Sequence, residues 1–166
     1  MTLVSPAVIP ARRVADVILS AARDREMEIT NLKLQKLLYY SQAWYLVFED
    51  SPLFSERLEA WVHGPVVPNV FGEFKSYRWN AIDTAVAIED VDPEIVGHVC
   101  EVMDAYGKFT ATQLERLTHS EEPWKEARGG LPQDEPSRNV INLATMKRFY
   151  SAALGDGQRS LSDGQR

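Results

Sequence analysis

The sequence predicts a mostly α-helical protein with a small β element (α+β): a single compact domain of about six helices around a central helix, plus short strands. Three observations support this fold class. Six segments have apolar residues at helical spacing, and one of them is apolar on more than one side, which is typical of a helix surrounded by protein. Segments that alternate as a strand would are few and short. The 166 residues, 45% of them apolar, suffice to bury a core without a metal or a disulfide.

The first two predicted helices make up the N-terminal part of the chain. Residues 11–24 have an apolar stripe on one face, whereas the other face is rich in arginine and is interpreted as exposed to solvent. The polar face consists of Arg12, Arg13, Asp16, Ser20 and Arg23. Thr30 is a suitable N-cap for a second helix that continues to about Glu49. This second helix has apolar residues on several sides, so we expect it at the centre of the fold.

Two segments after the second helix are candidate strands. Residues 56–62 alternate charged and apolar side chains and stop at His63-Gly64-Pro65. Because the residue before a proline avoids the α region, this tripeptide predicts a backbone bend. Val86 and Ile88 alternate with smaller or charged neighbours and form the second candidate strand.

Turn and capping residues place the next three helices. Pro68 suits the first turn of a third helix, where its missing N–H has no partner to lose. Asp92 opens a fourth helix that is expected to end at Gly107. Thr110 and Gln113 have the spacing of a capping box and predict a short fifth helix.

The C-terminal part is predicted to be one helix followed by a disordered tail. The helix is expected over about residues 142–154. From Gly155 onward the only large apolar residue is Leu161, which is too little buried surface to order a segment. The predicted organisation is therefore a domain over residues 10–154 and a disordered tail over residues 155–166.

The composition favours a cytoplasmic protein. The single cysteine excludes an intrachain disulfide framework and fits a reducing compartment. The longest run of aliphatic and aromatic residues spans residues 43–48, far short of the ~20 residues that cross a bilayer. The first nine residues carry no basic group ahead of their apolar part, so we expect no signal peptide.

The charge balance gives no support to nucleic-acid binding. The 18 basic and 24 acidic residues give a net charge of −6 and an isoelectric point near 5.1. Proteins that hold nucleic acid through phosphates usually carry a basic patch. The one alternative of this kind, a DNA-binding protein that regulates its own operon, would need the arginine-rich face of the first helix.

No catalytic constellation is found in the sequence, and the chain is predicted not to be an enzyme. It has no glycine-rich phosphate loop, no GxSxG and no HExxH. An uncharacterised hydrolase could use Cys100 as nucleophile with His63 or His119 as base, but Cys100 flanks an apolar helical stripe and is interpreted as core. These two histidines and His98 lack metal-ligand spacing, so no metal and no cofactor is expected.

The tryptophans give the first indication of a binding role. Trp44 lies on the central helix and is predicted to be core, as are Trp61 and Trp124. Trp79 follows Arg78 at the end of the third helix, outside its apolar stripe. Exposed tryptophan and arginine side chains at such positions are common anchors of protein–protein contacts.

An ordered series of motifs resembles a known family. Its members in this sequence are Leu-Gln-Lys-Leu-Leu-Tyr-Tyr at 34–40, Gln-Ala-Trp-Tyr-Leu at 42–46, Pro-Leu-Phe at 52–54, Glu-Ala-Trp-Val-His-Gly-Pro-Val-Val-Pro at 59–68, Tyr106-Gly107, Leu114, Leu117-Thr118-His119 and Pro123-Trp124. Over residues 10–152 this series resembles the Panacea domain, the family of SocA-like antitoxins that also includes phage-associated proteins. One departure is His63, where many family members have tyrosine.

The resemblance implies a binding protein. Members of this family resemble type II antitoxins, which neutralise a cognate protein toxin encoded by a neighbouring gene, and in one branch the antitoxin acts as an adaptor that delivers the toxin to a Clp-type protease. The acidic balance of this chain would suit a basic toxin and would speed its capture.

The predicted contact surface combines the bend with the end of the third helix. His63, Gly64 and Pro65 are expected to shape a groove beside that helix. Tyr77, Arg78 and Trp79 are predicted to contact the toxin, with His63 nearby.

Overall fold

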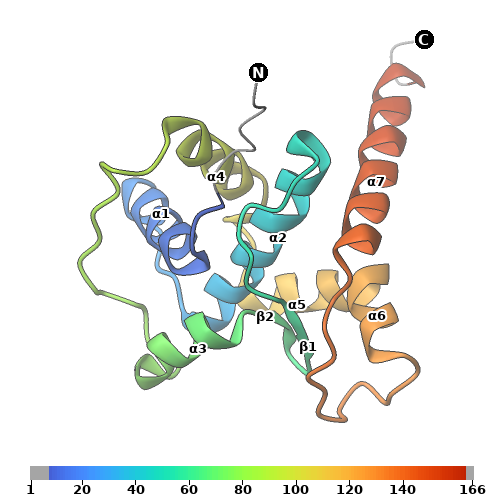
Figure 1. The fold of residues 1–166 in the computed structure, drawn as a ribbon, viewed down its shortest axis with the longest axis horizontal. Coiled ribbons are helices and arrows are strands. Elements are labelled where there is room, and N and C mark those ends of the chain that lie inside the picture. Colours follow the sequence, from blue (N-terminus) through green and yellow to red (C-terminus); the bar gives the residue numbers. More distant parts are fainter. Residues whose placement is uncertain (1–7, 164–166) are drawn as a thin grey trace, which may run out of the picture.

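The structure is a computed structural model, and it describes residues 8–163 (Figure 1). Helices account for most of it, and the only sheet among the described residues has two strands. The elements are α1 (Ala11–Asp24), α2 (Asn31–Glu49), β1 (Glu59–Trp61), β2 (Gly64–Val66), α3 (Pro68–Phe74), the 3₁₀ turn η1 (Lys75–Tyr77), α4 (Pro93–Tyr106), α5 (Ala111–Ser120), α6 (Glu122–Arg128) and α7 (Leu143–Asp163). The predicted fold class, mostly α with a small β element, is confirmed.

α2 is the central helix, as predicted. The Thr30 side chain accepts a hydrogen bond from the Lys33 N–H and so caps its first turn. Side chains on all its sides are buried, including Leu34, Leu38 and Tyr39. Helices α1, α4 and α7 pack against it along its length, and β2, α3 and α5 contact it as well (Figure 1). A helix apolar all round has no face to offer to water, which is why the other elements surround it.

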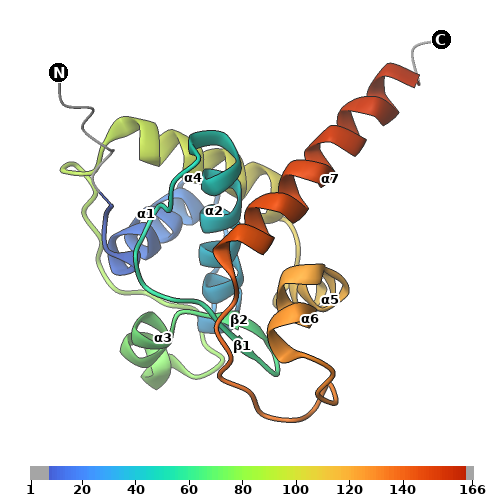
Figure 2. The same ribbon diagram turned by 45° about the vertical axis from the view of Figure 1, so that its right-hand side comes forward.

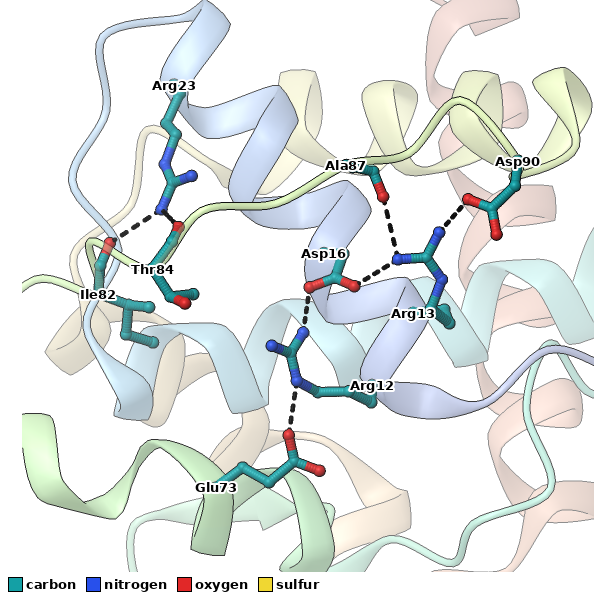
Figure 3. Close-up of polar contacts among 9 residues, drawn as sticks. All are labelled: Arg12, Arg13, Asp16, Arg23, Glu73, Ile82, Thr84, Ala87 and Asp90. Atoms are coloured by element: carbon teal, nitrogen blue, oxygen red, sulfur yellow. Dashed lines mark hydrogen bonds and ion pairs between the residues drawn. The ribbon is translucent and has the colours of Figure 1, made fainter.

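The arginine-rich face of α1 is only partly exposed to solvent, so that prediction was wrong in part: Arg23 is exposed, whereas Arg12 and Arg13 are half-buried. The segment over residues 78–92 runs in an extended path across this face, and α3 lies against it (Figure 3). Arg13 donates to the Ala87 carbonyl at 3.0 Å and pairs with Asp90, while Arg12 pairs with Glu73. Both arginines also pair with Asp16, which is buried.

Only one of the two predicted strands forms, and its partner is a segment predicted as a bend. β1 pairs with β2 antiparallel, with Glu59 opposite Val66 and Trp61 opposite Gly64. Pro65 lies opposite Ala60, and the Ala60 N–H points away from β2 and donates to the Asn139 carbonyl at 2.8 Å. The two residues therefore form no hydrogen bond with each other, and β2 loses none through the missing N–H of the proline. Residues 86–88 form no strand; they belong to the extended segment over α1.

The C-terminal third contains a helix that the sequence did not predict. Pro123 occupies the first turn of α6, where a proline is tolerated, but the Pro-Trp pair suggested a loop. α4 and α5 begin as predicted: Asp92 caps α4, and Thr110 and Gln113 form a reciprocal capping box.

α7 continues to Asp163 instead of ending near residue 154. No proline interrupts residues 143–163, so the backbone hydrogen bonds of the helix continue through Gly155 into the segment predicted to be disordered. The end of α7 extends away from the rest of the fold (Figure 2). The division into a domain over residues 10–154 and a tail stays a prediction.

Candidate partner-binding surface

Two of the sequence motifs meet through buried hydrogen bonds. The side chain of Gln35, on α2, accepts from the Val67 N–H at 3.0 Å and donates to Asn31 Oδ1 at 3.0 Å. Asn31 in turn donates to the Phe71 carbonyl at 3.0 Å. An amide side chain that satisfies a buried backbone N–H replaces the water that this group loses on folding. The motif on α2 therefore fixes where the hairpin ends and where α3 begins.

Further side chains fix the other sides of the hairpin. Arg128, which is buried, donates to the Ala60 carbonyl at 3.1 Å and to the Pro132 carbonyl at 2.8 Å, so it links β1 to the loop after α6. The indole of Trp124 donates to the Trp61 carbonyl at 2.8 Å. Trp124 is core, as predicted, while Trp61 is half-buried at the edge of the hairpin.

Gly64 allows the hairpin to approach α2 and α5 closely. Its φ of +114° lies in the region that favours glycine, and a Cβ there would lie 3.2 Å from Thr118 Oγ1 and 3.4 Å from Lys36 Cε. Packing therefore favours glycine at this position, and the chain reverses just before it, at Val62 and His63.

Lys36 is buried beneath this glycine. Its Nζ donates to the Leu32 carbonyl at 3.2 Å, and its side chain is 2% exposed. Burial lowers the pKa of Lys36 to about 8, with a smaller opposing effect from Glu115.

The two histidines near the hairpin have different surroundings. His63, in the turn between β1 and β2, is exposed, and its Nδ1 lies 2.9 Å from Glu115 Oε1. His119 stacks on Trp124 with ring centroids 3.9 Å apart, and its Nδ1 lies 2.7 Å from the side-chain nitrogen of Gln133. Burial lowers the pKa of His119.

A groove of about 500 Å³ lies between the hairpin, the start of α2 and the start of α3. Apolar side chains dominate it, and Trp61 meets Phe71 edge to face with centroids 5.1 Å apart. His63, Ser137 and Arg138 are its polar residues. The groove is lined by Leu32, Trp61, Val62, His63, Val66, Phe71, Pro136, Ser137 and Arg138. We call it the hairpin groove.

A tight turn at the end of η1 exposes Trp79. The Asn80 N–H donates to the Tyr77 carbonyl at 2.9 Å, and Arg78 has φ 55° and ψ −119°. These angles fit the first central position of a type II′ turn, which glycine normally occupies. Trp79 is 76% exposed, the largest exposed fraction among the large apolar side chains of the described residues. We call residues 77–80 the Trp79 turn.

The structure brings the six predicted site residues together only in part. His63 lines the hairpin groove, whereas Gly64 and Pro65 are buried within β2 and shape it from below. Tyr77, Arg78 and Trp79 do not line the groove; Tyr77 is half-buried and donates to Asp83 at 3.0 Å. α3 and the hairpin lie at the same end of the molecule in both views (Figures 1 and 2).

Several groove residues were missed from the sequence. Leu32 and Phe71 belong to predicted helices, but their exposure depends on how the hairpin packs. Arg138 lies in a loop that had no pattern of its own.

A second polar cluster joins α2, α6 and α7. Glu121 accepts hydrogen bonds from the hydroxyls of Tyr40 at 2.6 Å and Tyr150 at 3.0 Å, and the Tyr150 hydroxyl lies 2.9 Å from that of Tyr39. Burial raises the pKa of Glu121, and the two tyrosines oppose this effect. Each hydroxyl has a partner within the cluster, so it is suited to hold the helices together.

The structure separates Cys100 from His63, one of the two bases considered for a hydrolase. Cys100 is half-buried on α4, and α4 and the hairpin with His63 lie at opposite ends of the molecule (Figure 1). The ring of His119 stacks on Trp124, and its Nδ1 is hydrogen-bonded to Gln133. Among the described residues, no three His, Cys, Asp or Glu side chains are placed to hold a metal ion. In the same part of the chain, no helix has both the length and the hydrophobicity needed to cross a membrane.

The chain is thus a helical domain in which hydrogen-bonded motifs build a hairpin and the groove beside it. Comparison with known proteins identifies the family: residues 34–125 match the family described as "Antitoxin SocA-like, Panacea domain", and the chain belongs to it. The chain is also similar to Antitoxin SocA of Caulobacter vibrioides, with 32% identity over 132 residues, which cover 72% of this chain and 70% of that protein. No solved structure matches the chain.

Proposed function

We propose that this protein is the antitoxin of a type II toxin–antitoxin pair, that it acts in the cytoplasm without catalysis, and that it neutralises its toxin by direct binding. Membership of the antitoxin family supports the role. The observation that carries direct binding is the Trp79 turn, where a backbone conformation unfavourable for arginine keeps a tryptophan in solvent. Backbone strain that the fold itself does not need is a feature of functional surfaces.

The toxin contact extends from the Trp79 turn to the hairpin groove. An indole and a guanidinium at an exposed turn provide the residue types that dominate binding energy at interfaces. His63, at the groove, would provide a polar contact, and Gly64 and Pro65 would act indirectly by fixing the shape of the groove. Delivery of the bound toxin to a Clp-type protease would be a second step that leaves this contact in place.

Co-expression tests the proposed function. The product of the adjacent open reading frame is induced alone and together with this protein, and growth and co-purification are scored. We expect growth arrest by the neighbour alone, and rescue with a stable complex when both are present. Rescue accompanied by loss of the neighbour, and reversed when the Clp protease is deleted, would assign the adaptor role. A harmless neighbour that does not co-purify would contradict the proposal.

The DNA-binding alternative loses its one candidate surface. Arg12 and Arg13 are paired with Asp16, Glu73 and Asp90. Arg23 donates to the carbonyls of Ile82 and Thr84 (Figure 3). Arginines held by carboxylates and carbonyls are not free to displace counterions from a phosphate backbone.

A further inference from the structure

An apolar hollow lies at the opposite end of α2 from the hairpin groove. It has a volume of about 240 Å³ and is lined by residues of α2, α4 and α7. Its apolar lining includes Trp44, Phe48, Val102 and Leu154. Phe48 is 55% exposed and stacks on Trp44 with centroids 5.8 Å apart, so an aromatic surface faces solvent in the hollow that Leu154 of α7 also lines.

Carboxylates surround this hollow on one side. A second hollow of about 480 Å³ shares Phe48, His98 and Glu101 with the first and adds Glu49 and Glu94. The three glutamates are exposed, and none of them forms an ion pair with a cation in the part of the chain that the structure describes. Two of these glutamates also affect Tyr45. Burial is the largest cause of the raised pKa of Tyr45, and the negative charges of Glu49, Asp92 and Glu94 raise it further.

The combination of an apolar floor and an acidic rim defines the chemistry of an occupant. A helix that lies across the two hollows would insert apolar side chains spaced three and four residues apart beside Phe48, and lysines or arginines flanking them would meet Glu49, Glu94 and Glu101. Opposite charges at the rim would speed association and exclude acidic helices.

We infer that this acidic groove, formed by the two hollows, is a docking site for a basic amphipathic helix of a protein partner. The site is separate from the hairpin groove and the Trp79 turn, and the inference does not rest on the proposed function. A second copy of this chain is disfavoured as occupant because the chain is itself acidic, with a net charge of −6, whereas the site calls for a basic helix.

The test uses two synthetic peptides and the full-length protein. One fluorescently labelled peptide is an amphipathic helix with leucines on one face and lysines on the other, and the control peptide replaces every lysine with glutamate. Fluorescence anisotropy at two salt concentrations measures both affinities. We expect the lysine peptide to bind at least about tenfold more tightly than the glutamate peptide, with the difference shrinking at high salt. Equal affinity for the two peptides would overturn the inference.

Variants locate the binding. Phe48→Ser and Ala105→Arg change exposed residues of the groove, and Leu131→Ser removes an exposed leucine that lines neither hollow. We expect each groove variant to weaken binding of the lysine peptide at least about tenfold, and Leu131→Ser to leave it unchanged. Circular dichroism melting confirms that the variants fold. Unchanged binding of the lysine peptide by both groove variants would contradict the inference. Self-association of the wild type that Phe48→Ser abolishes would also contradict it, because the occupant of the groove would then be a second copy of this chain.

Discussion

Lys36 is a charged residue in a setting that favours its neutral form. Its ammonium group has lost its water and has one protein acceptor, the Leu32 carbonyl. The sequence shows a lysine within an apolar helix, but only the packing of Gly64 and Thr118 over it shows that it is buried. Its pKa in the folded protein, about 8, is lower than the 10.5 of an exposed lysine.

This difference predicts a rise of stability with pH. Between pH 8 and 10.5 the unfolded chain holds a proton on Lys36 that the folded protein has lost, so the free energy of unfolding increases with pH in this window. From pH 8 to about pH 9.5 the increase should be about 1.5 kcal/mol. Urea unfolding of the wild type and of Lys36→Met measures it, and the variant should show a smaller rise, because only the contribution of Lys36 is removed. An identical pH dependence in both proteins would show that Lys36 is solvated in the fold. The measurement stops at about pH 9.5 because burial raises the pKa of Tyr39 and Tyr40. Above that pH these tyrosines lose protons in the unfolded chain but not in the fold, which lowers the free energy of unfolding.

Gly64 and Gly72 make a matched pair for substitution. Gly64→Ala places a Cβ at a φ of +114° and 3.2 Å from Thr118 Oγ1, and we expect it to lower the free energy of unfolding by about 2 kcal/mol. Gly72 lies in α3 with nothing within 4 Å of the added Cβ, so Gly72→Ala should stabilise by up to ~1 kcal/mol through helix propensity. Thermal or urea unfolding gives both values, and a Gly64→Ala variant as stable as the wild type would refute the packing argument.

At the scale of the elements, local signals predicted the ends of helices better than the pairing of strands. Thr30, Asp92 and the capping box at Thr110 place three helix starts correctly because a cap depends on residues within one turn. β2 was missed because Gly64 and Pro65 are poor strand formers. The proline is acceptable because of the strand register, in which the Ala60 N–H points to Asn139 and away from Pro65.

Backbone strain at Arg78, in the Trp79 turn, can be tested by substitution. Since Arg78 occupies a turn position that suits glycine, Arg78→Gly should raise the free energy of unfolding by about 1 kcal/mol. Urea unfolding measures the change. No gain in stability would mean that the turn is not strained and that strain does not explain the exposure of Trp79.

For the whole molecule, the sequence predicts the central helix and the fold class but not the partners of the α1 arginines. Helical spacing distinguishes a polar face from an apolar one, but it does not show whether the polar face contacts water or another segment of the chain. Residues 78–92 cover part of that face, and Arg13 donates to Ala87, more than seventy positions away in the sequence. Of the candidate site, the bend and Trp79 were predicted, because glycine, proline and tryptophan are informative residue types. Leu32, Phe71 and Arg138 were not, because the groove exists only after the hairpin, α2 and α3 have packed.

The most direct test of the account is the affinity of the purified partner for this protein and for Trp79→Ala, measured by isothermal titration calorimetry, with Leu131→Ala as a control for loss of an exposed apolar side chain. If the protein neutralises a toxin by binding through the Trp79 turn, a stoichiometric complex forms, Trp79→Ala weakens it by about thirtyfold or more, and the control binds as the wild type does. Equal affinity of the wild type and Trp79→Ala, or no complex at all, would contradict the account.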